Sequence, residues 1–243
     1  MRINTTLLLL ATVMFLSSLC EASAQTFLES RQQYPVTESD GQRVITGFQP
    51  FSTDDNKIMA NAMKWVIEDA CEKERDALFD ININKKTFSY NRVVQYLSAG
   101  AVKYTFFYKV NIKIAEGKLV YTVYDIQYKG NSIIPLTSTS SINRLNPEKK
   151  AKHKEIITAL QEKASEELNK MFDAITENAC KPITHWNDIS IQRAVKGMNE
   201  DECTLAFGKP NSVYEDNNGR LQWSYGLNFV LIFKKDKLET IIR

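Results

Sequence analysis

Few side chains in this sequence have the chemistry for nucleophilic catalysis or for metal binding. The histidines are His153, in a lysine-rich stretch, and His185. A Ser/His/Asp or Cys/His system would have to use one of them, and neither lies in a strand-turn-helix motif that presents a nucleophile. Cys180 and His185 could supply two metal ligands, but a zinc site needs three or four. We therefore expect surface histidines, no metal and no cofactor.

Paired carboxylates are the other chemistry that the sequence offers. Glu166-Glu167 and Glu200-Asp201-Glu202 could serve general acid and base catalysis. Both groups fall in predicted helices, where we expect them on exposed faces as solvating charge. A secreted hydrolase with a carboxylate-based site is therefore the alternative function, and a noncatalytic protein is the first.

Two features favour binding. Lys149, Lys150, Lys152 and Lys154 form a basic cluster that could meet phosphate groups of a lipid or a polysaccharide, although an ordinary solvated helix face would look the same. Aromatic residues fill two adjacent predicted strands, whose successive side chains point to opposite faces. We expect some of them on an exposed partner surface, unless they pack against a second domain. Its tyrosines are Tyr104, Tyr108, Tyr121, Tyr124 and Tyr128.

The N-terminus predicts export. Arg2 precedes an apolar run over residues 7–19, and Ala22-Ser23-Ala24 has the small residues of a cleavage site. This pattern is typical of a secretory signal peptide over residues 1–24. Lipidation at Cys20 is the alternative, but Leu19 is a poor match to the small residue expected before a lipidated cysteine. We expect an exported protein, in the periplasm, at the outer membrane or outside the cell, with no membrane-spanning segment in the mature chain.

The mature chain would have 243 − 24 = 219 residues and a net charge of +2, because Arg2 and Glu21 leave together. That length suffices for two domains, and the near-neutral charge argues against a nucleic-acid partner. The mature cysteines are Cys71, Cys180 and Cys203. We expect Cys203 to be buried, and either a disulfide between Cys71 and Cys180 or three reduced thiols.

The spacing of apolar residues along the chain predicts a leader over residues 25–42 and an α+β domain over 43–180. In that domain a strand (44–48) and an amphipathic helix (52–74) precede four antiparallel strands and a second long helix (146–180). The four strands are expected over residues 79–83, 92–97, 103–115 and 119–128.

A linker over 181–188, with the helix breaker Pro182, is followed by a smaller domain over 189–243. Here we expect a short capped helix (200–207) closed by Gly208 and Pro210. Strands over 212–215, 221–225, 228–233 and 238–242 then make a four-stranded meander.

The smaller domain resembles the SmpA/OmlA (BamE-like) repeat, which also builds the β-lactamase-inhibitor-protein fold. The resemblance rests on Gly197-Met198-Asn199 with Cys203, on Phe207-Gly208-Lys209-Pro210, on Trp223-Ser224-Tyr225-Gly226 and on Lys235-Asp236-Lys237-Leu238. It implies a helix packed on a meander, and a role in the cell envelope, in outer-membrane protein assembly or in binding an enzyme.

Residues 44–180 more loosely resemble a secreted Bacteroidetes family with a TBP-like fold. The residues that carry this resemblance are the strand before Pro50, Ala62-Met63-Lys64-Trp65, and the tyrosine-rich hairpin with Gly117-Lys118-Leu119. It implies a curved antiparallel sheet with helices on one side, and no activity. Together these observations predict a noncatalytic envelope protein that binds or scaffolds another macromolecule, either an envelope protein or a surface polymer.

Overall fold

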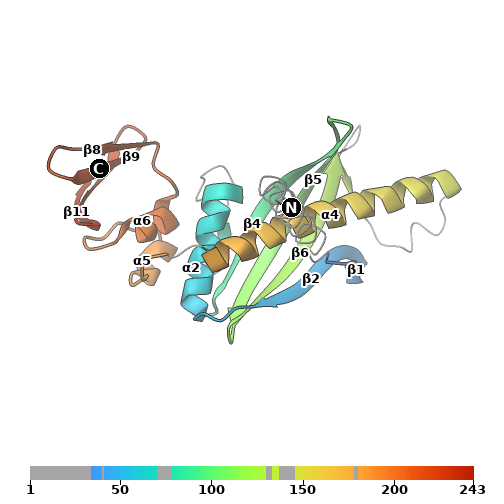
Figure 1. Ribbon diagram of the computed structural model, residues 1–243, viewed down its shortest axis with the longest axis horizontal. Coiled ribbons are helices and arrows are strands. Elements are labelled where there is room, and N and C mark those ends of the chain that lie inside the picture. Colours follow the sequence, from blue (N-terminus) through green and yellow to red (C-terminus); the bar gives the residue numbers. More distant parts are fainter. Residues whose placement is uncertain (1–33, 40, 71–77, 130–132, 137–145, 178–179) are drawn as a thin grey trace, which may run out of the picture. The chain divides into compact units, whose positions relative to one another are not determined.

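The computed structural model describes residues 34–39, 41–70, 78–129, 133–136, 146–177 and 180–243. Residues 34–243 form one compact unit with two antiparallel sheets and several helices (Figure 1), so the chain is of the mixed α+β class. The predicted signal peptide, Cys20 and Cys71 lie outside the described residues. Within the described residues, no helix is both long enough and apolar enough to cross a membrane.

The larger sheet has seven strands in the order β1-β2-β6-β5-β4-β3, and β7 pairs with β6. The four strands predicted between the two long helices are all present, with β4 five residues longer at its start than expected. The bounds are β1 (Val36–Ser39), β2 (Gln42–Pro50), β3 (Leu78–Asn82), β4 (Thr87–Ser98), β5 (Ala101–Ala115), β6 (Lys118–Lys129) and β7 (Ile133–Pro135).

The β5–β6 hairpin shows why this sheet has one buried face. Its turn is Glu116-Gly117, both at positive φ (55° and 70°), which is the geometry of a two-residue hairpin turn. Along β5 every second side chain from Tyr104 to Ile114 is buried, and the residues between them are half-buried or exposed. The buried face therefore carries the aromatic and aliphatic residues of this strand.

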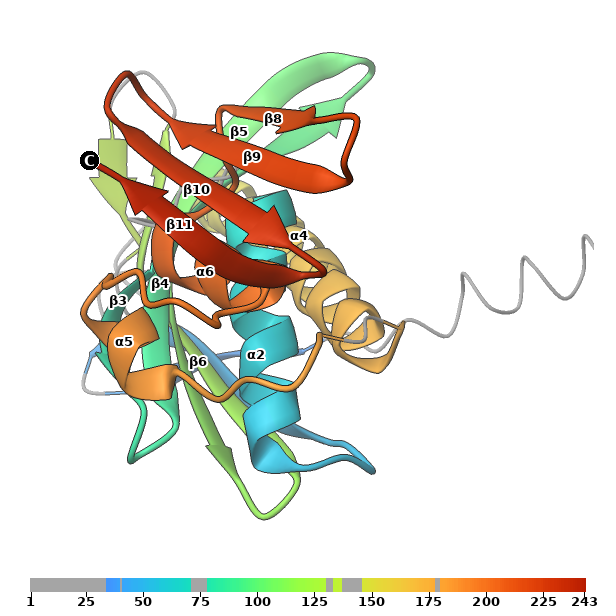
Figure 2. The same cartoon turned by 90° about the vertical axis from the view of Figure 1, so that its left-hand side faces the viewer.

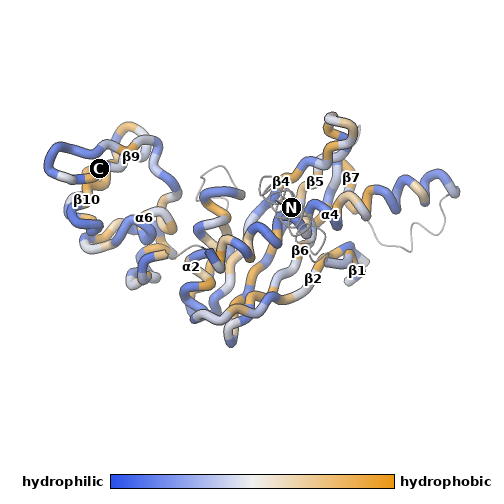
Figure 3. The backbone as a smooth tube through the Cα atoms, viewed as in Figure 1, coloured by the Kyte–Doolittle hydropathy of each residue, from blue (hydrophilic) through white to orange (hydrophobic). Residues whose placement is uncertain are grey.

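Two long helices cover that face (Figures 1 and 2). Helix α2 (Asp55–Trp65) begins after Asp54, whose side chain accepts hydrogen bonds from two backbone N–H groups, and it continues as a π-helix, η1 (Val66–Ala70). Helix α4 (Pro147–Glu177) buries one apolar stripe against the sheet and α2, while its first turns are hydrophilic (Figure 3). Both predicted long helices are present, and residues 71–74 of the first and 178–179 of the second lie outside the described residues.

Strand β1 lies within the predicted leader of residues 25–42, whose residues 25–33 lie outside the described residues. Tyr34 is buried, its backbone N–H donates to Ser165 Oγ (2.9 Å), and its hydroxyl donates to Asn169 Oδ1 (3.1 Å). Its ring also packs edge-on against Tyr121, with 5.4 Å between centroids. The sequence shows no period here because β1 is an edge strand with mostly exposed side chains, held by contacts to residues far along the chain.

The C-terminal part contains α5 (Trp186–Ser190), α6 (Glu200–Phe207) and a four-stranded sheet in the order β11-β10-β9-β8 (Figure 2). The predicted short helix has its expected bounds, and each predicted meander strand is present within one residue. The strands are β8 (Ser212–Glu215), β9 (Arg220–Tyr225), β10 (Phe229–Lys234) and β11 (Lys237–Ile242).

The start of α6 corrects the prediction that its acidic residues are solvated. Glu202 is completely buried and forms a capping box with Asn199. Asp201 is buried as well, and Lys64 of α2 donates to it at 2.6 Å. The sequence predicts exposure for these acidic residues because their spacing does not show that α2 packs against α6. The predicted domain boundary over 181–188 falls between the two sheets and stays a prediction.

Candidate functional site

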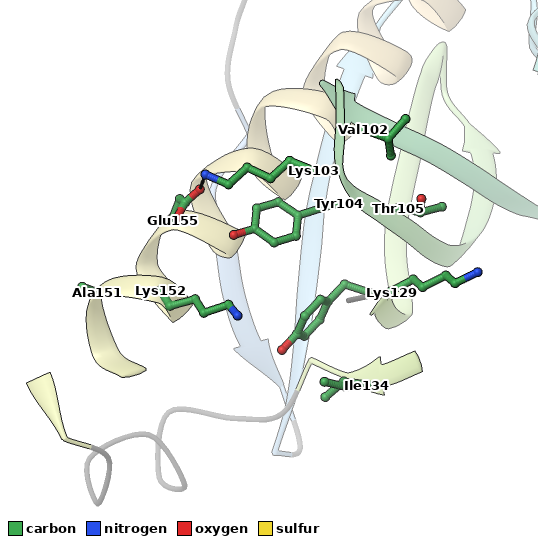
Figure 4. A pocket seen from close by; sticks show the side chains of 10 residues that line it. Val102, Lys103, Tyr104, Thr105, Lys129, Ile134, Ala151, Lys152 and Glu155 are labelled. Carbon is green, nitrogen blue, oxygen red and sulfur yellow. Dashed lines mark ion pairs between the residues drawn. The ribbon is translucent and has the colours of Figure 1, made fainter. Parts of the chain in front are cut away.

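A hollow of about 960 Å³ lies where the ends of β5, β6 and β7 meet the second turn of α4. In Figure 4, Tyr104, Lys152 and Glu155 lie around one space, and the Lys129 side chain points away from it. We call it the tyrosine–lysine pocket. Its lining residues are Val102, Lys103, Tyr104, Thr105, Tyr128, Lys129, Ile134, Ala151, Lys152 and Glu155.

Strand register brings the sheet residues of the pocket together. Thr105 pairs with Lys129, and Tyr128 pairs with Ile134 of β7. The rings of Tyr104 and Tyr128 meet edge-on, with 6.4 Å between centroids. These residues are far apart in the sequence, so the pocket exists only because the β5–β6 hairpin and β7 are paired.

The charge in the pocket is mostly positive. Lys103 and Glu155 form an ion pair whose hydrogen bond raises the pKa of Lys103 and lowers the pKa of Glu155. Within the described residues, Lys129 and Lys152 form no ion pair. Lys103 and Lys152 thus lie beside the carboxylate of Glu155, whereas the Lys129 side chain points away from it (Figure 4), and Lys152 is available to an anionic ligand.

Tyr104 adds a neutral hydrogen-bonding group. Burial raises the pKa of its hydroxyl, and the nearby carboxylate of Glu155 adds to this effect. The phenol therefore stays protonated at neutral pH. The ring packs against Tyr96 (6.3 Å, stacked), which fixes its position in the wall.

The predicted tyrosine surface is wrong for three of its five members. Tyr104, Tyr108 and Tyr121 are buried in the core between the large sheet and the helices. The reason is that the aromatic face of β5 and β6 is the face that the helices cover. A hidden side chain cannot form a partner surface, although Tyr104 also contributes to the wall of the pocket.

The remaining two tyrosines are half-buried and point to opposite faces of the sheet. Lys109 pairs with Tyr124 and Phe107 with Gln127, so β6 has one more residue than β5 over this stretch. This bulge includes Asp125 at a positive φ of 50°. It reverses the alternation and turns Tyr128 into the pocket, which sequence counting alone does not reveal.

The four lysines of the predicted basic cluster lie on α4, and only one of them faces the pocket. Lys152 lines the pocket, whereas Lys149, Lys150 and Lys154 are exposed outside it. Sequence reasoning missed Lys103, Lys129 and Glu155 as site residues. Their only signal was that each lies at the end of a predicted strand or near the start of a helix.

The two histidines were the other candidates from the sequence, and both contact or lie near charged side chains. His153 is half-buried, and burial together with Arg43 lowers its pKa, so it is not the solvated residue that was expected. His185 Nδ1 lies 3.0 Å from Glu202 Oε1. Among the described residues, no three His, Cys, Asp or Glu side chains are grouped so that they could hold a metal ion.

Among the described residues, Cys180 and Cys203 form no disulfide with each other. Cys203 is buried, as predicted, and burial raises its pKa. Cys180 is half-buried, and burial is the chief cause that raises the pKa of its thiol to about 12. Because Cys71 lies outside the described residues, its pairing with Cys180 stays a prediction.

Comparison with known proteins gives partial structural likenesses. No family model and no curated protein matches this chain. A TBP-like protein from Parabacteroides distasonis is 14% identical, with a TM-score of 0.46, over 59% of this chain and 99% of its own. A DUF4468 family protein from Bacteroides ovatus is 16% identical, with a TM-score of 0.43, over 60% of this chain and 94% of its own. These likenesses do not confirm the BamE-like resemblance.

Proposed function

We propose that this chain is a noncatalytic, exported cell-envelope protein that binds an anionic surface polymer in the tyrosine–lysine pocket. The observation that carries the proposal is the composition of this pocket, in which three lysines and one glutamate line the same hollow. Lysine ammonium groups attract phosphate, sulfate or carboxylate groups as point charges. The proposed ligand is therefore a polymer whose repeat unit carries an acidic group.

The size of the pocket supports an organic ligand over a simple ion. Its volume of about 960 Å³ is at the upper end of the range of roughly 300–1,000 Å³ that is typical of small-molecule sites. A single inorganic anion would leave most of this space to water. An acidic unit within a chain would place its charge near Lys152 and its uncharged part against Tyr128 and Ile134.

The state of the carboxylates supports a noncatalytic role. The pocket has one carboxylate, Glu155, and Lys103 holds its pKa low. A second hollow, of about 510 Å³, contains Glu166 and Glu167. Hydrogen bonds from Lys163 and Lys170 lower the pKa of Glu166 to about 2, so this side chain is not a proton donor at neutral pH. Arg92 donates to Glu167 in turn.

A place in the cell envelope rests on the predicted signal peptide and on the predicted BamE-like domain. Helix α6, the close at Gly208 and the four-stranded meander are the elements that such a domain would have. Export is tested by measuring the mass of the chain recovered from cells, which should begin at Gln25. A mass that includes residues 1–24 would contradict this part of the proposal.

Binding is tested by calorimetry with polygalacturonate and dextran sulfate as anionic polymers and dextran as the neutral one. The test variant is Lys103→Gln/Lys129→Gln/Lys152→Gln, which removes the three pocket charges. Its matched control is Lys149→Gln/Lys150→Gln/Lys154→Gln, which removes three charges outside the pocket. We expect the pocket variant to bind an anionic polymer at least about tenfold more weakly, and the control to lose much less. Equal losses in both variants, or no binding by the native protein, would refute the proposal.

A further inference from the structure

The four-stranded sheet carries another hollow, of about 640 Å³, at the end of the β9–β10 hairpin. Three aromatic rings form its base: Phe207 from α6, Tyr225 from β9 and Phe229 from β10. Their centroids are 5.1 to 5.9 Å apart. We call this site the aromatic hollow.

The base of the hollow is fixed within the fold. The Tyr225 hydroxyl donates to the carbonyl oxygen of Gly208 at 3.0 Å, so its polar end is already used. The rings of Phe207 and Phe229 meet edge-on. The hollow therefore offers a preformed apolar surface, which an apolar group can enter without reordering the wall.

Leu227 at the rim is the strongest sign of an absent partner. It is 99% exposed, whereas the next most exposed large apolar side chain of the described residues, Tyr214, is 64% exposed. Leu227 lies in the Gly226-Leu227-Asn228 turn, where Gly226 supplies the positive φ of 69°. Turns usually have polar residues, and this apolar side chain is almost fully exposed. The fold itself gives no reason for an apolar residue here.

The polar rim indicates what kind of molecule would fit. The Arg243 guanidinium lies 5.6 Å from the centre of the Phe229 ring and forms no ion pair with any described residue. The side-chain amides of Gln192 and Asn228 line the hollow and likewise have no hydrogen-bond partner within the described part of the chain. Gln192 is held at a positive φ of 53°. The site thus combines an apolar base, a free cation and free amides.

We propose that the aromatic hollow binds a peptide segment of a partner protein, through an apolar side chain that has an acidic residue within two positions of it. The apolar side chain would contact Phe207, Phe229 and Leu227, and the carboxylate would pair with Arg243. The amides of Gln192 and Asn228 match the hydrogen-bonding groups of a peptide backbone, which a lipid chain lacks. This site is separate from the tyrosine–lysine pocket.

The test uses a library of random heptapeptides selected on the mature full-length chain. The variants are Leu227→Asn and Arg243→Gln, both at exposed side chains, and the control is Val93→Asn, which changes an exposed apolar residue of the large sheet. We expect selected peptides to pair an apolar residue with Asp or Glu. Affinity should fall about tenfold or more in Leu227→Asn, as removal of a buried leucine contact implies, and should stay unchanged in the control.

Several results would overturn the proposal. One is that no peptide is enriched. Another is that the enriched peptides bind Leu227→Asn and Arg243→Gln with the same affinity as the native chain. Leu227-dependent binding to phosphatidylglycerol vesicles would show that the occupant is a membrane. Leu227-dependent dimerisation in sedimentation velocity would show that the occupant is a second copy of this chain. Peptide binding should persist in the triple pocket variant, so this test and that of the proposed function can fail separately.

Discussion

Glu202 allows the sharpest test of how this fold is held together. Its Oε1 accepts hydrogen bonds from the backbone N–H of Thr184 (2.5 Å) and of His185 (2.9 Å) and from the Thr184 hydroxyl (3.0 Å). Its Oε2 accepts from the backbone N–H of Asn199 (2.8 Å). One buried carboxylate thus joins the segment before α5 to the start of α6.

The substitution Glu202→Gln keeps the shape and removes the charge. One amide oxygen can still accept bonds, but the amide nitrogen must face a donor. At least one bond to a charged acceptor is lost, at about 1.5–3 kcal/mol, and a buried N–H is left unsatisfied. We expect the free energy of unfolding to fall by about 2–4 kcal/mol, which is a large part of the total of roughly 5–15 kcal/mol that is usual for a folded protein.

The effect should depend on pH. Burial alone would raise the pKa of Glu202, but the hydrogen bonds from Thr184, Asn199 and His185 outweigh it and hold the pKa below the ordinary value of 4.5. A carboxyl group with a lowered pKa in the folded state stabilises the fold above its unfolded pKa, and this contribution is lost as pH falls through the folded pKa. The difference between native protein and variant should therefore be full at pH 7 and shrink below about pH 4.5.

Urea unfolding at a series of pH values, followed by tryptophan fluorescence and circular dichroism, measures this difference. Glu215→Gln is the matched control, because it makes the same change at an exposed residue of β8 and should leave stability unchanged. The reasoning fails if Glu202→Gln unfolds within about 0.5 kcal/mol of the native protein at pH 7, which is the range of an ordinary surface substitution. It also fails if the difference stays constant into acid.

Three further outcomes follow from the packing. Gly47→Ala should destabilise the protein by about 1–3 kcal/mol in thermal unfolding, because the new Cβ would overlap the hydroxyl oxygen of Tyr121; unchanged stability would show that this ring can move. Asp201→Asn and Lys64→Met should show a coupling energy of about 0.5–3 kcal/mol in a double-mutant cycle, since the two groups lie 2.6 Å apart and are partly buried; additive effects would mean that the ion pair does not stabilise the contact of α2 with α6. Cys180, whose pKa is about 12, should react slowly with iodoacetamide at pH 8 in the native protein and quickly in urea, as mass spectrometry can follow; rapid native labelling would contradict its burial, and none in urea would indicate a disulfide.

The sequence by itself determined most of the secondary structure. Alternation over β5 and β6, the Glu116-Gly117 turn and the stripe of α4 are local patterns, because a strand repeats every two residues and a helix every 3.6. The capped helix α6 was equally evident, since Asn199 and Gly208 supply its ends. These features depend on residues a few positions apart, which a sequence shows directly.

Only the tertiary structure decided which faces are buried and where a site forms. The tyrosines of β5 and β6 seemed to offer a partner surface, and the helices cover most of them. The sequence predicted a solvated Glu202, but the structure buries its carboxylate against Thr184 and His185. The bulge at Asp125 turns Tyr128 toward Lys103 and Lys152, which lie far away in the sequence. Burial and charge pairing depend on contacts between distant segments, and spacing along one chain does not contain that information.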